Sequence, residues 1–126
     1  MVFKVQRFNT NTSYPMLIST IIDKLGLEVF AGATNLNREV EGGYTSDLLS
    51  DVMGNADAGY VWITLQTHKN VMAIASLKEL SAVILVKGNE PDADTIELSN
   101  QEEVPLLGTK LEAFEISGKL YQLLNC

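Results

Sequence analysis

The sequence predicts a single layered α/β domain with a mostly parallel sheet. Its 126 residues, of which 46% are hydrophobic and 20% charged, suffice for one ordinary domain with its own core. From residue 60 onward, short apolar runs typical of buried strands alternate with helical patterns. Strands that alternate with helices imply right-handed crossovers and parallel strands. No linker divides the chain, so we expect an α/β/α sandwich.

The first fifteen residues differ in character from the rest. Residues 9–13 form a polar run with little that can pack, and a clear helical pattern begins only near Met16. We therefore expect a poorly packed N-terminal arm over residues 1–15 and the domain itself over residues 16–126. The alternatives are an upstream start or a swapped strand that uses Val2, Phe3 and Val5.

The first elements of the domain follow from spacing and glycine placement. Five apolar residues between Leu17 and Leu25 lie on one helical stripe, and Gly26 stands where a left-handed C-cap is favoured. Residues 27–31 are predicted to form a short strand, followed by a polar turn. Residues 39–44 alternate loosely around a pair of glycines.

A short helix is then predicted over residues 47–53. Ser46 is a suitable N-cap for it, and its acidic first turn suits the helix dipole. Gly54 is expected to end this helix, and Gly59 to make a further turn.

The second half of the chain has a regular rhythm. Pro105 indicates that the strand containing it is an edge strand, or begins there. Thr109 and Glu112 have the spacing of a capping box that opens the last helix. The predicted elements are a strand over 60–65, a helix over 70–80, a strand over 82–86, a helix from Pro91 and Asp92 to about 102, a strand over 104–107 and a helix to about 124.

Composition excludes several classes of partner. The formal net charge is −7, and nine Lys and Arg residues are scattered singly, which argues against nucleic-acid binding. No apolar stretch approaches the length of a membrane span, and no secretory signal is evident. The single cysteine, Cys126, rules out an internal disulfide and fits a reducing compartment, so we expect a cytoplasmic protein.

Catalytic motifs are missing. Gly54 and Gly59 have the glycine spacing of a phosphate-binding loop, but Tyr60 and Val61 follow where Lys and Ser or Thr are needed. Neither a dinucleotide-binding glycine motif nor a nucleophile elbow is present. One His and one Cys cannot hold zinc without two or more carboxylates. We therefore expect no enzymatic activity, no cofactor and no ATP turnover.

Two short segments are candidates for a binding site. Residues 66–68 follow a predicted buried strand and precede a helix, where open α/β sheets bind ligands and helix N-termini favour anions. Residues 42–47 combine paired glycines with two hydroxyls before a helix. We expect one shared site with these ligand-binding residues: Gly42, Gly43, Thr45, Ser46, Gln66, Thr67 and His68.

Simpler roles compete with these assignments. The first segment can serve only as a polar loop that caps its helix, and the second as a tight turn. Asp47 and Asp51 lie one predicted helical turn apart and could hold a hydrated Mg²⁺, but we favour a solvated acidic face and expect no metal site.

Residues 37–54 resemble the DRTGG domain family. Residues 37–43 read Asn-Arg-Glu-Val-Glu-Gly-Gly, so the family's Arg and paired glycines are kept, while Asn37 replaces the Asp and three residues separate Arg38 from the glycines. Residues 60–68 are also similar to stand-alone members, and the resemblance extends over about residues 16–124. It implies a layered α/β sandwich like the N-terminal domain of HPr kinase/phosphorylase. It also implies a regulatory or dimerising role, since such domains accompany CBS domains in regulated pyrophosphatases.

Two functions are compatible with these observations. The first is a non-catalytic regulatory module that binds a small phosphorylated ligand, such as an adenine nucleotide. The second is a dimerisation or protein-docking module without a small ligand. Its support is the excess of apolar surface on the helices predicted at 70–80 and before 124, from which we expect a homodimer.

Overall fold

A six-stranded sheet forms the middle layer of the molecule. The computed structural model describes residues 3–6 and 15–125, the first four by their backbone alone. The sheet has the order β1-β3-β4-β5-β6-β2. Its strands are β1 (Phe3–Gln6), β2 (Glu28–Ala31), β3 (Gly42–Thr45), β4 (Tyr60–Thr64), β5 (Ala82–Leu85) and β6 (Leu106–Gly108). Strands β3 to β6 are parallel, whereas β1 and β2 close the two edges in antiparallel pairing with β3 and β6.

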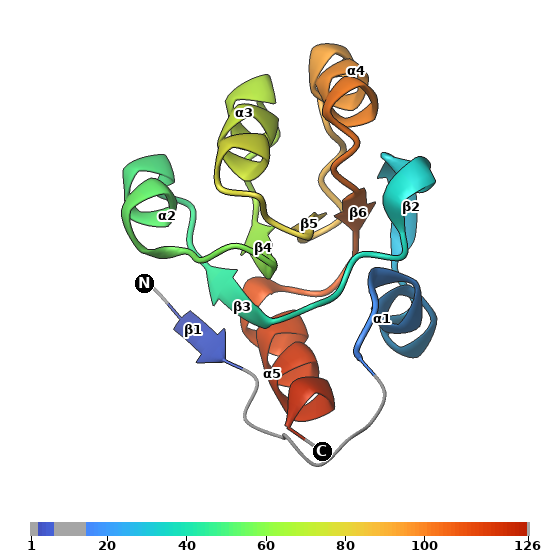
Figure 1. The fold of residues 1–126 in the computed structure, drawn as a ribbon, viewed down its shortest axis with the longest axis vertical. Helices are drawn as coiled ribbons and strands as arrows, with labels where there is room; N and C mark the ends of the chain where they lie inside the picture. Colours follow the sequence, from blue (N-terminus) through green and yellow to red (C-terminus); the bar gives the residue numbers. More distant parts are fainter. Residues whose placement is uncertain (1–2, 7–14, 126) are drawn as a thin grey trace.

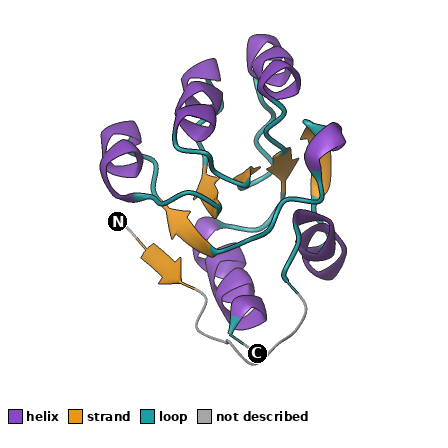
Figure 2. Cartoon of the chain, in the orientation of Figure 1, coloured by secondary structure: helices purple, strands orange, loops and turns teal. Residues whose placement is uncertain are grey.

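Helices cover both faces of this sheet, which confirms the predicted sandwich. The helices are α1 (Ile18–Leu25), α2 (Leu49–Asn55), α3 (Lys69–Leu77), α4 (Ala93–Glu102) and α5 (Ala113–Leu124), with a short 3₁₀ helix at Ala33–Asn35. Figure 1 shows α2, α3 and α4 in a row on one face, and α1 and α5 on the other. Figure 2 shows the strands as a middle layer, with loops that join them to helices on both sides. No helix in the described part of the chain is long and apolar enough to cross a membrane.

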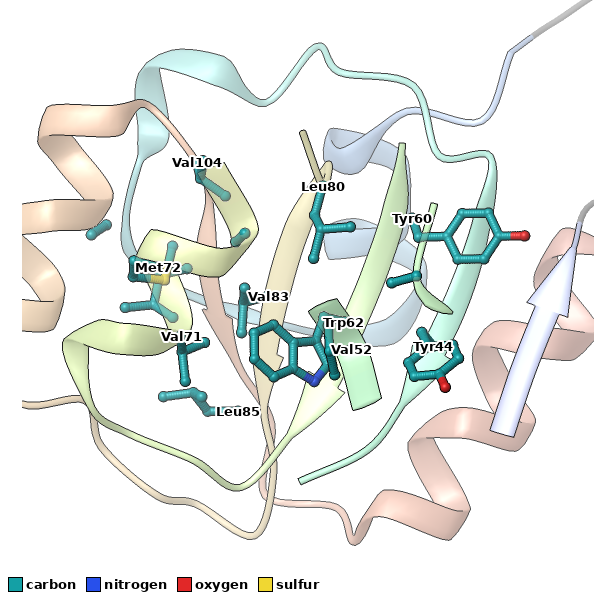
Figure 3. Packing of buried hydrophobic residues seen from close by; sticks show 14 residues of the cluster. Tyr44, Val52, Tyr60, Trp62, Val71, Met72, Leu80, Val83, Leu85 and Val104 are labelled. Atoms are coloured by element: carbon teal, nitrogen blue, oxygen red, sulfur yellow. The ribbon is translucent and has the colours of Figure 1, made fainter. Parts of the chain in front are cut away.

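The two helical layers pack against opposite sides of the same strands. Successive residues of a strand point to opposite faces, so Trp62 belongs to one core and its neighbour Ile63 to the other. Figure 3 shows the indole of Trp62 among the side chains of the α2–α3–α4 face. That cluster includes Val52, Val71, Met72, Val83 and Leu85. The opposite cluster includes Ile18, Ile21, Ile84, Ile116 and Leu120.

Two predicted helix starts are wrong by two or three residues. The Ser46 hydroxyl accepts a hydrogen bond from Leu48 N (3.1 Å), and α2 begins only at Leu49. The Thr109 hydroxyl likewise accepts from Leu111 N (3.1 Å), so no capping box forms, and α5 begins at Ala113. In both places a hydroxyl satisfies a local amide in a turn rather than an amide of the first helical turn, because the two options compete.

The N-terminal segment contributes one strand to the sheet. Residues of β1 pair with β3 in the same chain, with Val5 opposite Gly43, although they lie within the expected poorly packed arm. The remaining residues before Pro15 lie outside the described part of the chain, as does Cys126. The domain boundary at residue 16 therefore stays a prediction.

Candidate functional site

The predicted glycine turn is part of the sheet. Gly42 and Gly43 are the first two residues of β3, both are buried, and they pair with β1 on one side and β4 on the other. Paired glycines usually mark turns, but Gly42 and Gly43 are hydrogen-bonded within the sheet instead. The turn assignment is therefore wrong, and the residues that reach the sheet's carboxyl edge are Thr45, Ser46 and Asp47.

The two predicted segments meet at this edge, because β3 and β4 are neighbouring parallel strands. The Gln66 side-chain amide donates to the Asp47 carbonyl (2.9 Å). The Asp47 carboxylate accepts through Oδ1 from the Thr64 hydroxyl and from Leu65 N, both at 2.9 Å. Asp47 thus ties the end of β3 to the end of β4. It lies outside α2, so the proposed helical pairing with Asp51 does not form.

Thr67 and His68 take a different course from Gln66. The Thr67 carbonyl accepts from the Thr95 hydroxyl (2.7 Å) and from Asp92 N (3.3 Å), which turns this residue toward the start of α4. His68 is exposed at the N-cap position of α3 and makes no side-chain capping hydrogen bond. Their contact with a ligand stays a prediction, and the groove described next does not include them.

A groove of about 700 Å³ opens between the end of β3 and the outer side of α5. A second hollow of about 580 Å³ adjoins it beyond the start of α5, where Leu65, Val86 and Lys87 form one wall. Phe114 lines both hollows and is 93% exposed. The larger groove is lined by Thr45, Ser46, Asp47, Ala113, Phe114, Glu115, Ser117, Gly118, Lys119 and Gln122.

The α5 side of the groove escaped the sequence analysis as a binding site. The hydroxyls of Thr45 and Ser117 lie 2.7 Å apart and join β3 to α5 at the groove floor. Ser117 is buried, whereas no heavy atom among residues 15–125 lies within 4 Å of the place where a Cβ of Gly118 would stand. The sequence pattern of this helix predicted a surface for a homodimer rather than a site for a small ligand.

Trp62 connects the groove to the core beneath it. Its indole Nε1 donates to the Ser46 carbonyl (2.8 Å), and the whole side chain is buried. A buried carbonyl needs such a partner, since an unsatisfied one costs about 1–3 kcal/mol. The loop at Ser46 and Asp47, which forms one wall of the groove, is therefore held in place by the buried side chain of Trp62.

The groove carries charges of both signs and lacks a catalytic arrangement. Asp47 and Glu115 contribute carboxylates, and Lys119 an ammonium group. The described residues place no nucleophile beside a general base there. They also contain no group of three or more His, Cys, Asp or Glu side chains that could hold a metal ion. The arrangement can bind a small molecule through hydrogen bonds and aromatic contact.

Tyr44 provides a pH-dependent link between β3 and α2, on the face of the sheet opposite to α5. Its hydroxyl donates to both carboxylate oxygens of Asp51 at 2.9 Å. Burial, then the hydrogen bond to Asp51 and the charge of Asp51, raise the pKa of Tyr44 from 10.0 to about 12. The fold therefore favours the neutral phenol, and its contribution to stability is complete below pH 10 and is lost between pH 10 and 12.

We expect Tyr44→Phe to remove this titration. Between pH 10 and 12 the free energy of unfolding should fall more steeply for the wild-type protein than for the variant, as measured by urea unfolding at each pH. If the free energy of unfolding depends on pH in the same way for both proteins over that range, the pKa of Tyr44 is not raised by folding.

A search of solved structures supports the fold class independently. The chain is similar to a structure of the CBS and DRTGG domains of the regulatory region of Clostridium perfringens pyrophosphatase, complexed with its activator, diadenosine tetraphosphate. The TM-score is 0.67 at 16% sequence identity, over 83% of this chain and 46% of that chain. This chain thus spans less than half the length of that one. No family model matches the sequence, and a search of curated proteins also finds no match.

At this identity the likeness establishes the fold alone. It agrees with the DRTGG-like architecture expected from residues 37–54, while membership of the family stays a prediction. The matched structure is a regulatory region and not a catalytic one.

Proposed function

We propose that the chain is a non-catalytic regulatory module that binds a small phosphorylated ligand, an adenine nucleotide, in the groove between β3 and α5. The observation that carries this proposal is an aromatic ring left open to solvent beside a groove of about 700 Å³. Small-molecule sites have this size, with apolar walls and a few convergent polar groups. The carboxyl ends of parallel strands are also where α/β proteins place such ligands.

The base is expected to stack on Phe114. An exposed phenyl ring offers a flat apolar surface, and offset stacking of aromatic rings contributes about 0.5–1.5 kcal/mol beyond the area that is buried. The ribose hydroxyls are expected to donate to Oδ2 of Asp47, because the described residues donate only to Oδ1 of this carboxylate. Thr45 and Ser117 supply further hydroxyls at the groove floor.

Lys119 is the natural partner for the phosphate. It lines the groove one helical turn after Glu115, and Lys87 lines the adjoining hollow. Glu112 and Glu115 already place negative charge at the start of α5, where a phosphate would otherwise be favoured. Because the whole chain has a net charge of −7, we expect weak, salt-sensitive binding.

One further fact supports this function. The similar pyrophosphatase region is complexed with diadenosine tetraphosphate, an activator in which two adenosines are joined through four phosphates. We further propose that the module acts in the cytoplasm, since a chain with one cysteine needs no oxidising environment.

A thermal-shift panel tests the proposal. We expect AMP, ADP, ATP or diadenosine tetraphosphate to raise the melting temperature, since a ligand at one hundred times its Kd stabilises by about 2.7 kcal/mol. Adenosine and inorganic phosphate, tested separately, show which half of the ligand dominates. Phe114→Ala should abolish the shift and leave the apo protein folded, because Phe114 is 93% exposed.

Two matched controls sharpen the result. Leu77→Ala removes another exposed apolar side chain, on α3 and 70% exposed, and should leave the nucleotide response unchanged. His68→Ala tests the loop that the sequence analysis had included. A nucleotide shift that survives Phe114→Ala would rule out this groove, and a shift lost in His68→Ala would place the ligand beyond it.

Docking of a second protein surface is the other candidate function. Leu48 and Leu65 follow the ends of β3 and β4, and Phe114 starts α5, so three exposed large apolar side chains gather at one edge of the sheet. Exposed apolar patches mark interaction sites. No thermal response to any nucleotide, together with a mass above 13.8 kDa in solution, would favour this role.

A further inference from the structure

We propose that a second copy of this chain docks on the outward face of α5, with Phe114 of each copy entering the groove of the other. The groove would then have two competing occupants, a second copy and a small ligand. The competition rests on the proposed function, whereas the docking does not.

The outward face of α5 combines a protruding side chain with an open space. Ile116, Leu120 and Leu124 point into the core, whereas Phe114, Glu115, Gly118 and Lys119 are exposed. On that side Phe114 is 93% exposed and stands one turn before Gly118. A Cβ at Gly118 would have no heavy atom of the described residues within 4 Å, so a ring from outside can lie against the helix backbone there.

Such a surface is complementary to itself. In a two-fold dimer the same patch meets on both copies, so a residue that contacts a second one is contacted by it in turn. Two α5 helices that cross antiparallel near Gly118 would bring Phe114 over Gly118 and Gln122 of the second copy. Each ring would then enter a groove of about 700 Å³.

Charge complementarity selects a second copy as the occupant. Glu115 and Lys119 both line the groove and are exposed, and Lys119 lies one helical turn after Glu115. In the antiparallel arrangement Glu115 of one copy faces Lys119 of the other, and this pair occurs twice. A parallel arrangement would place like charges together. These pairs oppose the repulsion between two chains that each carry a net charge of −7.

The expected dimer is weak. A stable interface buries about 800 Å² on each partner, and one face of a twelve-residue helix with its flanks offers less. The monomer and dimer should therefore interchange with concentration, which is the regime in which a ligand in the same groove can shift the balance.

Charge reversal provides the decisive experiment. In sedimentation velocity, the wild-type chain should shift from 13.8 kDa toward twice that mass as its concentration rises. Glu115→Lys alone and Lys119→Glu alone should each remain monomeric, because each creates two like-charge contacts. An equimolar mixture of the two variants should recover the dimer, because both cross-pairs are then attractive.

Gly118→Leu supplies an independent variant. Its Cβ would meet no heavy atom of the described residues within 4 Å, so the monomer should fold with unchanged or higher helicity while dimerisation weakens at least tenfold. A wild-type chain that stays monomeric at high concentration overturns the proposal. So does a dimer that persists in Glu115→Lys and in Gly118→Leu, since the interface would then lie elsewhere.

The competition has its own readout. Addition of the nucleotide that raises the melting temperature should lower the dimer fraction. A dimer that is lost in the α5 variants but shows no nucleotide response means that the proposed ligand is wrong and the interface right. A chain that binds nucleotide but stays monomeric means that the proposed ligand is right and the interface wrong. If nucleotide binds without changing the dimer fraction, the proposed competition is wrong.

Discussion

Replacing Trp62 with alanine should lower the free energy of unfolding by about 3–5 kcal/mol, the range seen when a large aromatic side chain is removed from a core. Trp62 is fully buried among the side chains of the α2–α3–α4 face, where the surrounding helices can close only part of the cavity. The measurement is guanidinium unfolding followed by circular dichroism, since Trp62 is the chain's one tryptophan and its fluorescence is lost with it.

Trp62→Phe is the matched control for the hydrogen bond. It keeps an aromatic ring but leaves the Ser46 carbonyl without its donor, at a cost of about 1–3 kcal/mol. Because Ser46 lines the groove, this variant should also weaken the nucleotide response more than its loss of stability explains. A loss below about 1 kcal/mol in Trp62→Ala would contradict the central position of this residue in the core.

Gly32→Ala is expected to be the second most damaging substitution. Gly32 has φ +74°, and an added Cβ would stand 2.4 Å from the Val104 carbonyl oxygen and 2.7 Å from the Pro105 Cα. These are backbone atoms at the entrance to β6, so neither can turn aside as a side chain would. Backbone strain and overpacking together should destabilise the fold by about 3 kcal/mol.

Gly26→Ala separates these two causes. Gly26 ends α1 with a similar φ of +64°, yet in the part of the chain that the structure describes no heavy atom lies within 4 Å of the place where its Cβ would stand. This variant should lose only the conformational part, about 1 kcal/mol. If chemical unfolding shows the same loss of stability in Gly32→Ala and Gly26→Ala, the close approach of Gly32 to the backbone before β6 does not contribute to the destabilisation.

The sequence located those elements whose signal is local. Strand β5 is an unbroken apolar run, and α1 has both its apolar spacing and Gly26, so each was predicted to within a residue or two. Ser46 and Thr109 misled because a hydroxyl before a helix can bond to either of two amides, and only the packed structure selects one. The direction of β2 was likewise not readable, since antiparallel pairing with β6 depends on where distant segments lie.

One wall of the groove could be predicted from local sequence. Thr45 and Ser46 were included because residues that follow neighbouring parallel strands must meet at one edge of the sheet, and both line the groove, whereas their contact with a ligand stays a prediction. The other wall, with Phe114 and Ser117, lies far away in the chain and is joined to Thr45 only by tertiary packing. No local pattern distinguishes an outward helix face that lines a groove from one that simply faces water.

The antiparallel pairing of β2 with β6 has a consequence for synthesis of the chain. Glu28 leaves the ribosome early, but its partner, Gly108, is made only after three strand–helix units have been completed. Throughout that interval β2 lacks its neighbour, so the sheet cannot acquire its final edge. The block from β3 to β6 can assemble as it emerges, because each of its strands pairs with the next one along the chain. Strand β2 therefore has to wait, once it has been made, until β6 emerges before it can pair.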